Sequence, residues 1–197
     1  HMGAVMDQFE EVLFPSLKTK ITNMPVVPDG AKESTININS IHGGLNEGFD
    51  GLPSPLVPDS CRMILDRRFL IEENLDDVKM EVRQILDDLT TKRPSFRYEL
   101  RDLFEVIPTM ADTDAPVVRE VSSAIQEILG KPAELVVSPG TYDQKHIDRI
   151  GKLSNCIAYG PGILDLAHQP DEYVDVDDML DSAKVMAISA YNLLQGN

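Results

Sequence analysis

Apolar positions follow two different spacings in residues 4–103 of the chain. In two segments they recur every three to four residues, as in an amphipathic helix; these segments are 4–18 and 75–89. In three others they alternate with polar residues, as in a half-buried strand; these are 34–41, 61–70 and 94–104. The order helix, strand, strand, helix, strand predicts a small antiparallel sheet backed by helices.

Within these segments the pattern also predicts which side chains face inward. Pro15 should kink or end the first helix, and Asn74 can cap the second, with Asp77 at its third position. Arg62, Asp66 and Arg68 share the polar face of their strand. The predicted inward-facing residues are Val5, Phe9, Val12, Leu13, Leu17, Ile36, Ile38, Cys61, Met63, Leu65, Phe69, Leu75, Val78, Val82, Ile85, Leu86, Leu89, Phe96, Tyr98 and Leu100.

The second half of the chain has a different pattern. A helix is expected from Pro116 to Gly130, capped by Asp114, and a last helix from Asp175 to Leu194. Between them lie two short apolar segments, 133–137 and 155–160, which predict strands of a mixed sheet covered on both faces. Two such strands make a poor sheet by themselves, so this half is expected to be part of a larger domain. The predicted inward-facing residues are Val117, Val121, Ile125, Ile128, Leu180, Ala183, Ala187, Ala190 and Leu194.

Length and charge narrow the function classes. The 197 residues favour two compact units, and a net charge of −15 argues against nucleic-acid binding and against attachment to an anionic membrane surface. No apolar run approaches the roughly 20 residues of a membrane helix, and no signal peptide is visible. Cys61 and Cys156 are too few for a disulfide framework, so two reduced, buried thiols in a cytoplasmic protein are expected. His1-Met2 has the form of a vector remnant, which leaves room for the natural chain to begin earlier.

The stretch YGPGILDLAHQPDEYVDVDD, residues 159–178, presents a histidine after a glycine turn. Gly160 and Gly162 allow close approach of a ligand to the backbone, and a neutral imidazole is a common zinc ligand. One histidine makes no metal site, and no other histidine has a matching spacing. His42 is expected at a strand end and His146 on a solvated helix. Pro170 prevents a regular helical arrangement of His168 and Glu172.

This stretch, continued to Leu194, resembles the C-terminal end of the co-catalytic zinc hydrolase family. That family contains acetylornithine deacetylase, succinyl-diaminopimelate desuccinylase, carboxypeptidase G and aminoacylase, and its members end with Gly-Pro-Gly, Ala-His, Glu-Tyr-Val and a last helix. Three upstream segments add to the resemblance: GAVMDQFEEV matches the first helix of the family's lid, VPDSCRMILDRRFL a lid strand, and PGTYDQKHI a turn of the catalytic domain. The resemblance covers the whole chain.

The resemblance implies an α/β fold in two parts. Residues 4–107 would form an α+β lid or dimerisation domain, with an antiparallel sheet and two helices. Residues 108–197 would form the C-terminal portion of a mixed-sheet α/β catalytic domain. In the family the HxD motif and the paired glutamates belong to an N-terminal part of the catalytic domain, and the lid histidine precedes the lid's first helix; no segment of this chain matches them. The resemblance therefore implies that the chain holds no catalytic residue and is inactive alone.

The resemblance also implies the site residues. His168 would complete the ligand set of one of two zinc ions, with cobalt or manganese as alternatives. Arg68 would bind the carboxylate of an N-acyl amino acid or small peptide whose amide bond is cleaved. Thr141, Asp143, Gly160 and Gly162 would line the substrate cleft.

Several alternatives stay open. Arg68 could instead pair with a carboxylate across the sheet, and Thr141 and Asp143 could make ordinary turn hydrogen bonds. Tyr142 and Gln144 stand where the family usually has Ser and Ala, and Pro55 stands where it often has Asn, which leaves the substrate open. A homodimer through the lid is expected. The competing function is a non-catalytic dimerisation or interaction module.

Overall fold

A computed structural model describes residues 1–44 and 58–196. Pro55, which the sequence singled out, lies outside these residues. The chain divides into two compact units, one formed by 1–22 and 33–104 and the other by 23–32 and 105–197. The division expected near residue 107 lies close to the crossing at 104, but compactness alone does not identify a lid, so that assignment stays a prediction.

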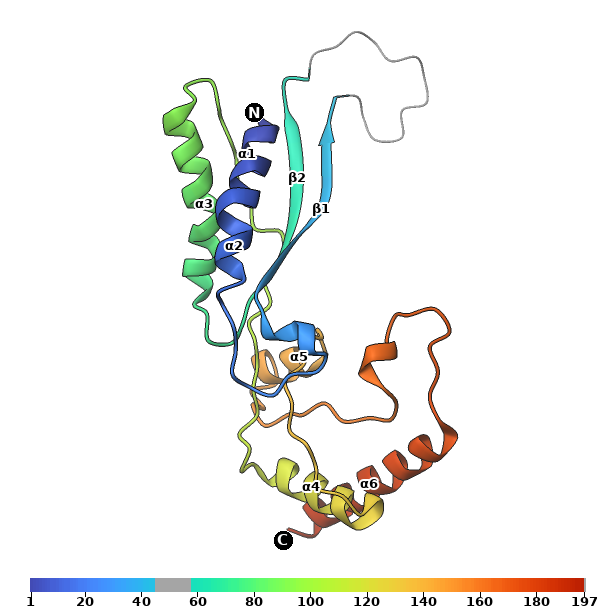
Figure 1. The fold of residues 1–197 in the computed structure, drawn as a ribbon. Helices are drawn as coiled ribbons and strands as arrows, with labels where there is room; N and C mark the ends of the chain where they lie inside the picture. The colour runs from blue at the N-terminus through green and yellow to red at the C-terminus, as the bar shows by residue number, and fades with distance from the viewer. Residues whose placement is uncertain (45–57, 197) are drawn as a thin grey trace. The chain divides into compact units, whose positions relative to one another are not determined.

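The first unit begins with a continuous helical segment (Figure 1). It consists of α1 (Met2–Gln8), a π-helical turn (Phe9–Leu13) and α2 (Phe14–Leu17). Pro15 does not end the helix, because it lies in the first turn of α2, directly after the widened π-helical turn. The predicted helix is thus confirmed, with the irregularity placed just before the proline.

Helix α3 (Leu75–Lys92) lies beside α1, as Figure 1 shows. Asn74 caps it as predicted: its Oδ1 accepts hydrogen bonds from the backbone N–H groups of Asp76, at 2.8 Å, and Asp77, at 3.4 Å. Packing of the two helices creates the core of the unit. The buried apolar residues in it are Ala4, Val5, Phe9, Leu13, Leu17, Val82, Ile85, Leu86, Leu89 and Phe96.

An antiparallel pair of strands, β1 (Thr35–Gly43) and β2 (Cys61–Arg68), completes the first unit. Their register runs from Thr35 opposite Arg68 to Gly43 opposite Cys61, with an irregularity between Ile38 and Ser40. The inward residues of both strands pack against the core as predicted; they are Ile36, Ile38, Met63 and Leu65.

Three predictions for this unit are wrong. Residues 94–104 form no strand, since no described segment pairs with them, although Phe96 is buried and Tyr98 and Leu100 pack against the core. Val12 is 49% exposed, because the π-helical turn shifts the phase of the stripe. Cys61 is exposed at the start of β2, and Cys156 is half-buried, so both thiols are free without being buried.

The second unit contains α4 (Pro116–Leu129), α5 (Gln144–Arg149), a 3-10 turn (Leu164–Leu166) and α6 (Val176–Gln195). Helix α4 starts at Pro116 and ends at Gly130, whose φ of 67° is left-handed, as the sequence predicted. Its cap position is held by Ala115, not by the predicted Asp114. Asp175 caps α6 by accepting a hydrogen bond from the N–H of Asp177 at 2.8 Å.

The two strands predicted for this unit are absent from the described residues. Only Val137 makes a bridge, parallel to Val26, with the N–H of Val27 donating to the Val137 carbonyl at 3.0 Å. Residues 155–160 form no strand and pair with no described segment. A strand needs a neighbour for its backbone groups, and the described chain provides none here.

The faces of the last helix also differ from the prediction. Residues Ser182, Val185 and Ser189 are buried, whereas Leu180 and Leu194 are 55% and 87% exposed. Ala183, Ala187 and Ala190, predicted to face inward with them, are exposed too.

Helix α4 packs against this small-residue face of α6 (Figure 1). Ser189 Oγ donates to the Val185 carbonyl at 2.7 Å and to the Glu120 carbonyl at 3.4 Å. On α4, Val118 and Ala124 are buried, and the predicted stripe Val117, Val121, Ile125 and Ile128 is only half-buried. The small residues therefore form the helix contact, and the larger apolar side chains of α6 stay uncovered by the described residues.

Candidate functional site

His168 lies in a tight turn after the 3-10 turn Leu164–Leu166. Its backbone is left-handed, with φ of 63°, and Asp171 has φ of 60°. His and Asp tolerate this region better than most residues. The backbone N–H of His168 donates to Glu172 Oε2 at 3.2 Å. Glu172 is thus a partner of the His168 backbone, and the exposed imidazole makes no hydrogen bond within the described part of the chain.

Gly160 and Gly162 differ in what the fold requires of them. Gly162 has φ of 93°, where a side chain would strain the backbone, and an added Cβ would lie 3.6 Å from Val174. At Gly160 an added Cβ would meet nothing within 4 Å. Gly162 also lines a hollow of about 240 Å³, with Ile163, Tyr173, Val174, Asp175 and Asp178.

Thr141 and Asp143 lie at the start of α5, and both are exposed. The Asp143 carbonyl accepts hydrogen bonds from the N–H groups of His146, at 2.8 Å, and Ile147, at 3.2 Å. The Asp143 side chain makes no capping hydrogen bond. The backbone of Asp143 therefore starts α5 and leaves its carboxylate unused by the helix. His146 lies exposed on α5, as predicted.

The two unusual residues at this turn have local structural roles. Tyr142 lies over Gly140, where an added Cβ would come within 2.6 Å of its ring, and Tyr142 Oη lies 2.9 Å from Ser138 Oγ. Gln144 Nε2 donates to the Cys156 carbonyl. This bond links the start of α5, next to Asp143, to the irregular segment that leads to Gly160.

Arg68 is the last residue of β2, opposite Thr35, in the first unit. Its side chain is 57% exposed, and its Nε donates to Asp66 Oδ2 at 3.4 Å. The partner is on the same strand, not across the sheet as the alternative reading expected. Within the described residues, no hydrogen bond involves its two terminal nitrogens. Arg68 belongs to the first unit, and the other five predicted site residues belong to the second.

The sequence analysis missed a charged cluster next to Arg68. It joins Arg67, Lys20, Glu73 and Glu81, and the side chains of Arg67 and Glu73 are each only 10% exposed. The alternation of residues 61–70 already indicates this cluster, because Arg67 lies on the same predicted inward face as Leu65 and Phe69. A charged residue on a buried face indicates an internal ion pair.

Glu73 is the centre of this cluster. Burial disfavours its ionised form, but hydrogen bonds from Ser34, the Leu70 N–H, Lys20 and Arg67 outweigh burial and lower its pKa to about 2. Burial likewise opposes the charge of Lys20, and hydrogen bonds to Glu81 and Glu73 raise its pKa above the ordinary value. These shifts in pKa keep Glu73 and Lys20 ionised throughout the physiological pH range.

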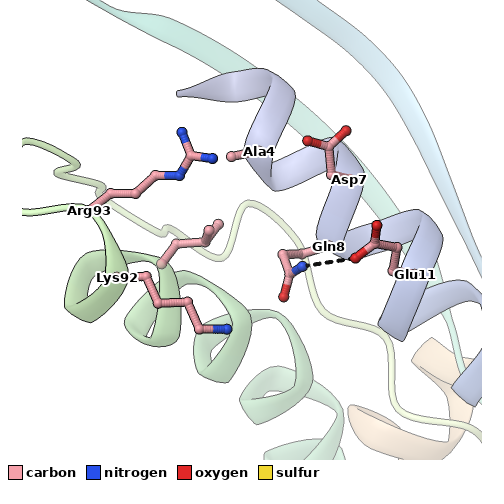
Figure 2. Close-up of a pocket in the computed structure, with 7 residues that line it drawn as sticks. Ala4, Asp7, Gln8, Glu11, Lys92 and Arg93 are labelled. Atoms are coloured by element: carbon pink, nitrogen blue, oxygen red, sulfur yellow. Dashed lines mark hydrogen bonds between the residues drawn. The ribbon is translucent and has the colours of Figure 1, made fainter.

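A second hollow, of about 500 Å³, lies between α1 and α3 (Figure 2). It is lined by the apolar residues Ala4 and Leu89 and by the charged or polar residues Asp7, Gln8, Glu11, Lys92 and Arg93. Gln8 Nε2 donates to Glu11 Oε2 at 3.4 Å. None of the predicted site residues borders it.

Residues 1–44 and 58–196 contain no group of three or more His, Cys, Asp or Glu side chains arranged to hold a metal ion. The same residues contain no helix with the length and apolarity needed to cross a membrane.

A solved structure shares the fold. An M20 family metallo-carboxypeptidase from Sulfolobus solfataricus superposes with a TM-score of 0.56, at 17% identity, over 95% of this chain and 43% of its own. An α/β fold, as predicted, accommodates both the helices and the antiparallel pair of this chain.

Two curated relatives extend the comparison. Succinyl-diaminopimelate desuccinylase of Hydrogenovibrio crunogenus is 26% identical over 161 residues, which are 82% of this chain and 39% of that protein. Acetylornithine deacetylase of Myxococcus xanthus is 26% identical over 154 residues, 78% of this chain and 37% of that protein. The chain thus spans about two fifths of the length of these relatives. The profile of peptidase family M20/M25/M40 matches residues 7–192, so the resemblance seen in the sequence is confirmed and the chain belongs to this family.

Proposed function

We propose that this chain is the lid and the C-terminal catalytic portion of a metal-dependent hydrolase that cleaves an amide bond of an N-acyl amino acid or small peptide. Family membership supports hydrolysis, and two relatives are named for deacetylation and desuccinylation. The observation that carries the proposal is the geometry of His168. Its backbone is fixed by a left-handed turn and by Glu172, while its imidazole is exposed and available to a ligand.

The donor set fits a shared metal site, not a complete one. An imidazole is a good zinc ligand, but zinc takes three or four protein ligands, and the described residues group no others with His168. We assign the remaining ligands, and the general base, to a preceding part of the protein, as the length of the relatives allows. Two zinc ions, or cobalt or manganese in their place, would supply polarisation of the amide carbonyl.

The chain's own residues would bind and orient the substrate. The terminal nitrogens of Arg68 suit a bidentate contact with a substrate carboxylate. The Gly160–Gly162 turn, Thr141 and the carboxylate of Asp143 would line the cleft in the second unit. The two free thiols favour a reducing compartment, and we place the protein in the cytoplasm on that basis.

A histidine pair in this chain allows a matched test. In the complete protein, His168→Ala should remove about one zinc and lower the rate on N-acetyl and N-succinyl amino acids by two or more orders of magnitude, roughly. His146→Ala, which changes an exposed histidine of α5, should change neither quantity. Metal content by mass spectrometry and initial rates decide the assignment. If His168→Ala kept both metal and rate, His168 would not be a ligand.

We further propose that the isolated 197-residue chain is inactive, because its described residues group no complete set of metal ligands. Zinc-dependent turnover of N-acyl amino acids by the purified chain would refute this.

Self-association through the first unit is a second candidate function, compatible with the first. The described sheet has only two strands, so each has an edge with unpaired backbone groups, which can pair with a second copy. A fragment of residues 1–107 should then scatter light as a dimer at about tens of micromolar. A monomer at that concentration would exclude the lid as the dimer contact. A dimer in a complete protein that neither binds metal nor hydrolyses amides would favour the non-catalytic interaction module.

A further inference from the structure

Arg67 and Arg68 are neighbours in sequence with opposite environments. Arg67 is 10% exposed and contacts Glu81 on α3, while Arg68 is 57% exposed on the other face of β2. Two adjacent residues of a strand point to opposite faces, so burial of the first fixes the direction of the second.

Arg67 is bonded on every side of its guanidinium. Nε donates to Glu81 Oε2 at 3.1 Å, and Nη2 donates to Glu73 Oε1 at 2.7 Å and to Glu81 Oε1 at 3.3 Å. The remaining nitrogen, Nη1, donates to the backbone carbonyl of Arg68. Three carboxylate oxygens of Glu73 and Glu81 hold the planar guanidinium in place. The Arg68 carbonyl is therefore bonded to a rigid group.

Glu73 fixes the chain on the other side of Arg68. Its Oε2 accepts a hydrogen bond from the Leu70 N–H at 2.7 Å, and its own N–H donates to the Leu70 carbonyl at 3.0 Å. Arg68 therefore lies between two anchored backbone points, its own carbonyl and the amide of Leu70. Both anchors originate in the same pair, Arg67 and Glu73.

The carboxylates of the cluster are paired with its own cations and so do not engage the guanidinium of Arg68. Two carboxylates, Glu73 and Glu81, face two cations, Arg67 and Lys20. The lowered pKa of Glu73 keeps that carboxylate charged across the working pH range. Among residues 1–44 and 58–196, the only carboxylate paired with Arg68 is that of Asp66, which lies 3.4 Å from Nε. Its two terminal nitrogens are the pair that a carboxylate would engage.

We propose that Arg67, held by Glu73 and Glu81, is a positioning residue that fixes the end of β2 so that Arg68 presents its guanidinium to a substrate carboxylate. This inference rests on the proposed function, since it needs Arg68 to bind substrate. Arg67 itself touches no substrate in this account. Its role is to keep the backbone of Arg68 in one place.

The first test uses the 197-residue chain and needs no activity. Arg67→Lys keeps the charge but cannot bond Glu73, Glu81 and the Arg68 carbonyl together. The backbone ¹⁵N order parameters of Arg68 and Phe69 should fall from about 0.85 to below about 0.6. Arg62→Lys, an exposed change on the same strand, is the matched control and should leave them unchanged. Glu81→Gln is the second variant if Arg67→Lys does not fold. Unchanged order parameters in a folded variant would overturn the proposal.

The second test measures KM and kcat in the complete protein, with a carboxylate substrate and with its carboxamide. Arg67→Lys should raise KM for the carboxylate substrate roughly tenfold, with kcat nearly unchanged and little effect on the carboxamide. Arg68→Ala is the reference. If Arg68→Ala raises KM and Arg67→Lys does not, this inference alone is overturned. If Arg68→Ala itself leaves KM unchanged, the substrate role of Arg68 in the proposed function fails as well.

Discussion

The two units differ in how well they bury their own apolar residues. In the first, two helices and a strand pair enclose a core centred on Phe9 and Leu13, which are 1% and 2% exposed. In the second, α4 and α6 meet mainly through Val118, Ala124 and Val185, next to two buried serines. Large apolar residues of that unit remain exposed, among them Ile150, Leu153, Val176, Leu180 and Leu194.

Exposed apolar surface on this scale marks a surface made for contact. The first unit has what a self-sufficient domain needs. The second has helices of sound local sequence, with an Asp175 cap and a Gly130 stop, but little to pack against. The contrast supports our proposal that the second unit completes a catalytic domain with a part of the protein that lies outside this chain.

The largest change in stability is expected from a substitution in the core of the first unit. Phe9→Ala removes a fully buried ring and should lower the free energy of unfolding of that unit by about 3–5 kcal/mol. Val12→Ala, on the same helical segment but half exposed, should cost less than about 1 kcal/mol. Denaturant titration followed by far-ultraviolet circular dichroism measures both. Equal costs would mean that the core is not where the structure places it.

The next largest effect should be a loss of stability in acid that is confined to the first unit. The pKa of Glu73 is lowered to about 2 from the ordinary 4.5, so its contribution to stability is present above pH 4.5 and is lost as the pH falls toward 2. Glu73→Gln should remove part of this pH dependence in the first unit and leave amides of α6 unaffected. Hydrogen exchange of α3 and α6 between pH 5 and pH 2 is the measurement, with those limits set by roughly the two pKa values. A wild-type pH profile in Glu73→Gln would show that another carboxylate controls acid stability.

The two glycines near His168 give a smaller, matched effect within the second unit. Gly162→Ala places a Cβ at φ of 93° and should cost about 1–2 kcal/mol. Gly160→Ala meets open space and should be within about 0.5 kcal/mol of the parent. Thermal unfolding of the two variants compares them directly. A larger cost at Gly160 would contradict the geometry of the turn.

The smallest effect on stability should come from the uncovered face of α6. Leu180→Ser with Leu194→Ser should change the free energy of unfolding by less than about 0.5 kcal/mol per site, because both side chains are exposed. Binding of a hydrophobic dye to the chain should fall. The same double substitution at Val82 and Leu86, buried in the first unit, is the contrasting control and should unfold that unit. Strong destabilisation by the α6 pair would mean that these leucines are already packed.

Prediction from sequence worked where an element's own residues settle its structure. The helices that begin at residues 2, 75, 116 and 176 follow their own apolar periodicity, with side-chain caps at Asn74 and Asp175 and a glycine stop at Gly130. Strand β1 alternates cleanly between exposed and half-buried positions. Prediction failed where the structure of a segment depends on a neighbouring segment that pairs with it. The strand expected at 94–104 lacks a pairing partner among the described residues, and so do those at 133–137 and 155–160.

The faces of α6 show the same limit. Its leucine and alanine stripe is a sound helical pattern, yet the described contact uses Ser182, Val185 and Ser189. Periodicity finds an apolar face but does not say what covers it. For the site, the prominence of His168 came from resemblance and not from spacing, and its role as a ligand stays a prediction. Arg67 was visible as a charge on an inward face and was overlooked.

The central claim is that the second unit is completed by another part of the protein while the first is complete in itself. Hydrogen–deuterium exchange, measured on the 197-residue chain and on the complete protein, tests this most directly. We predict that α6 exchanges much more slowly in the complete protein, because its apolar face becomes covered, while α3 exchanges at the same rate in both. Equal exchange of α6 in the two proteins would contradict the account.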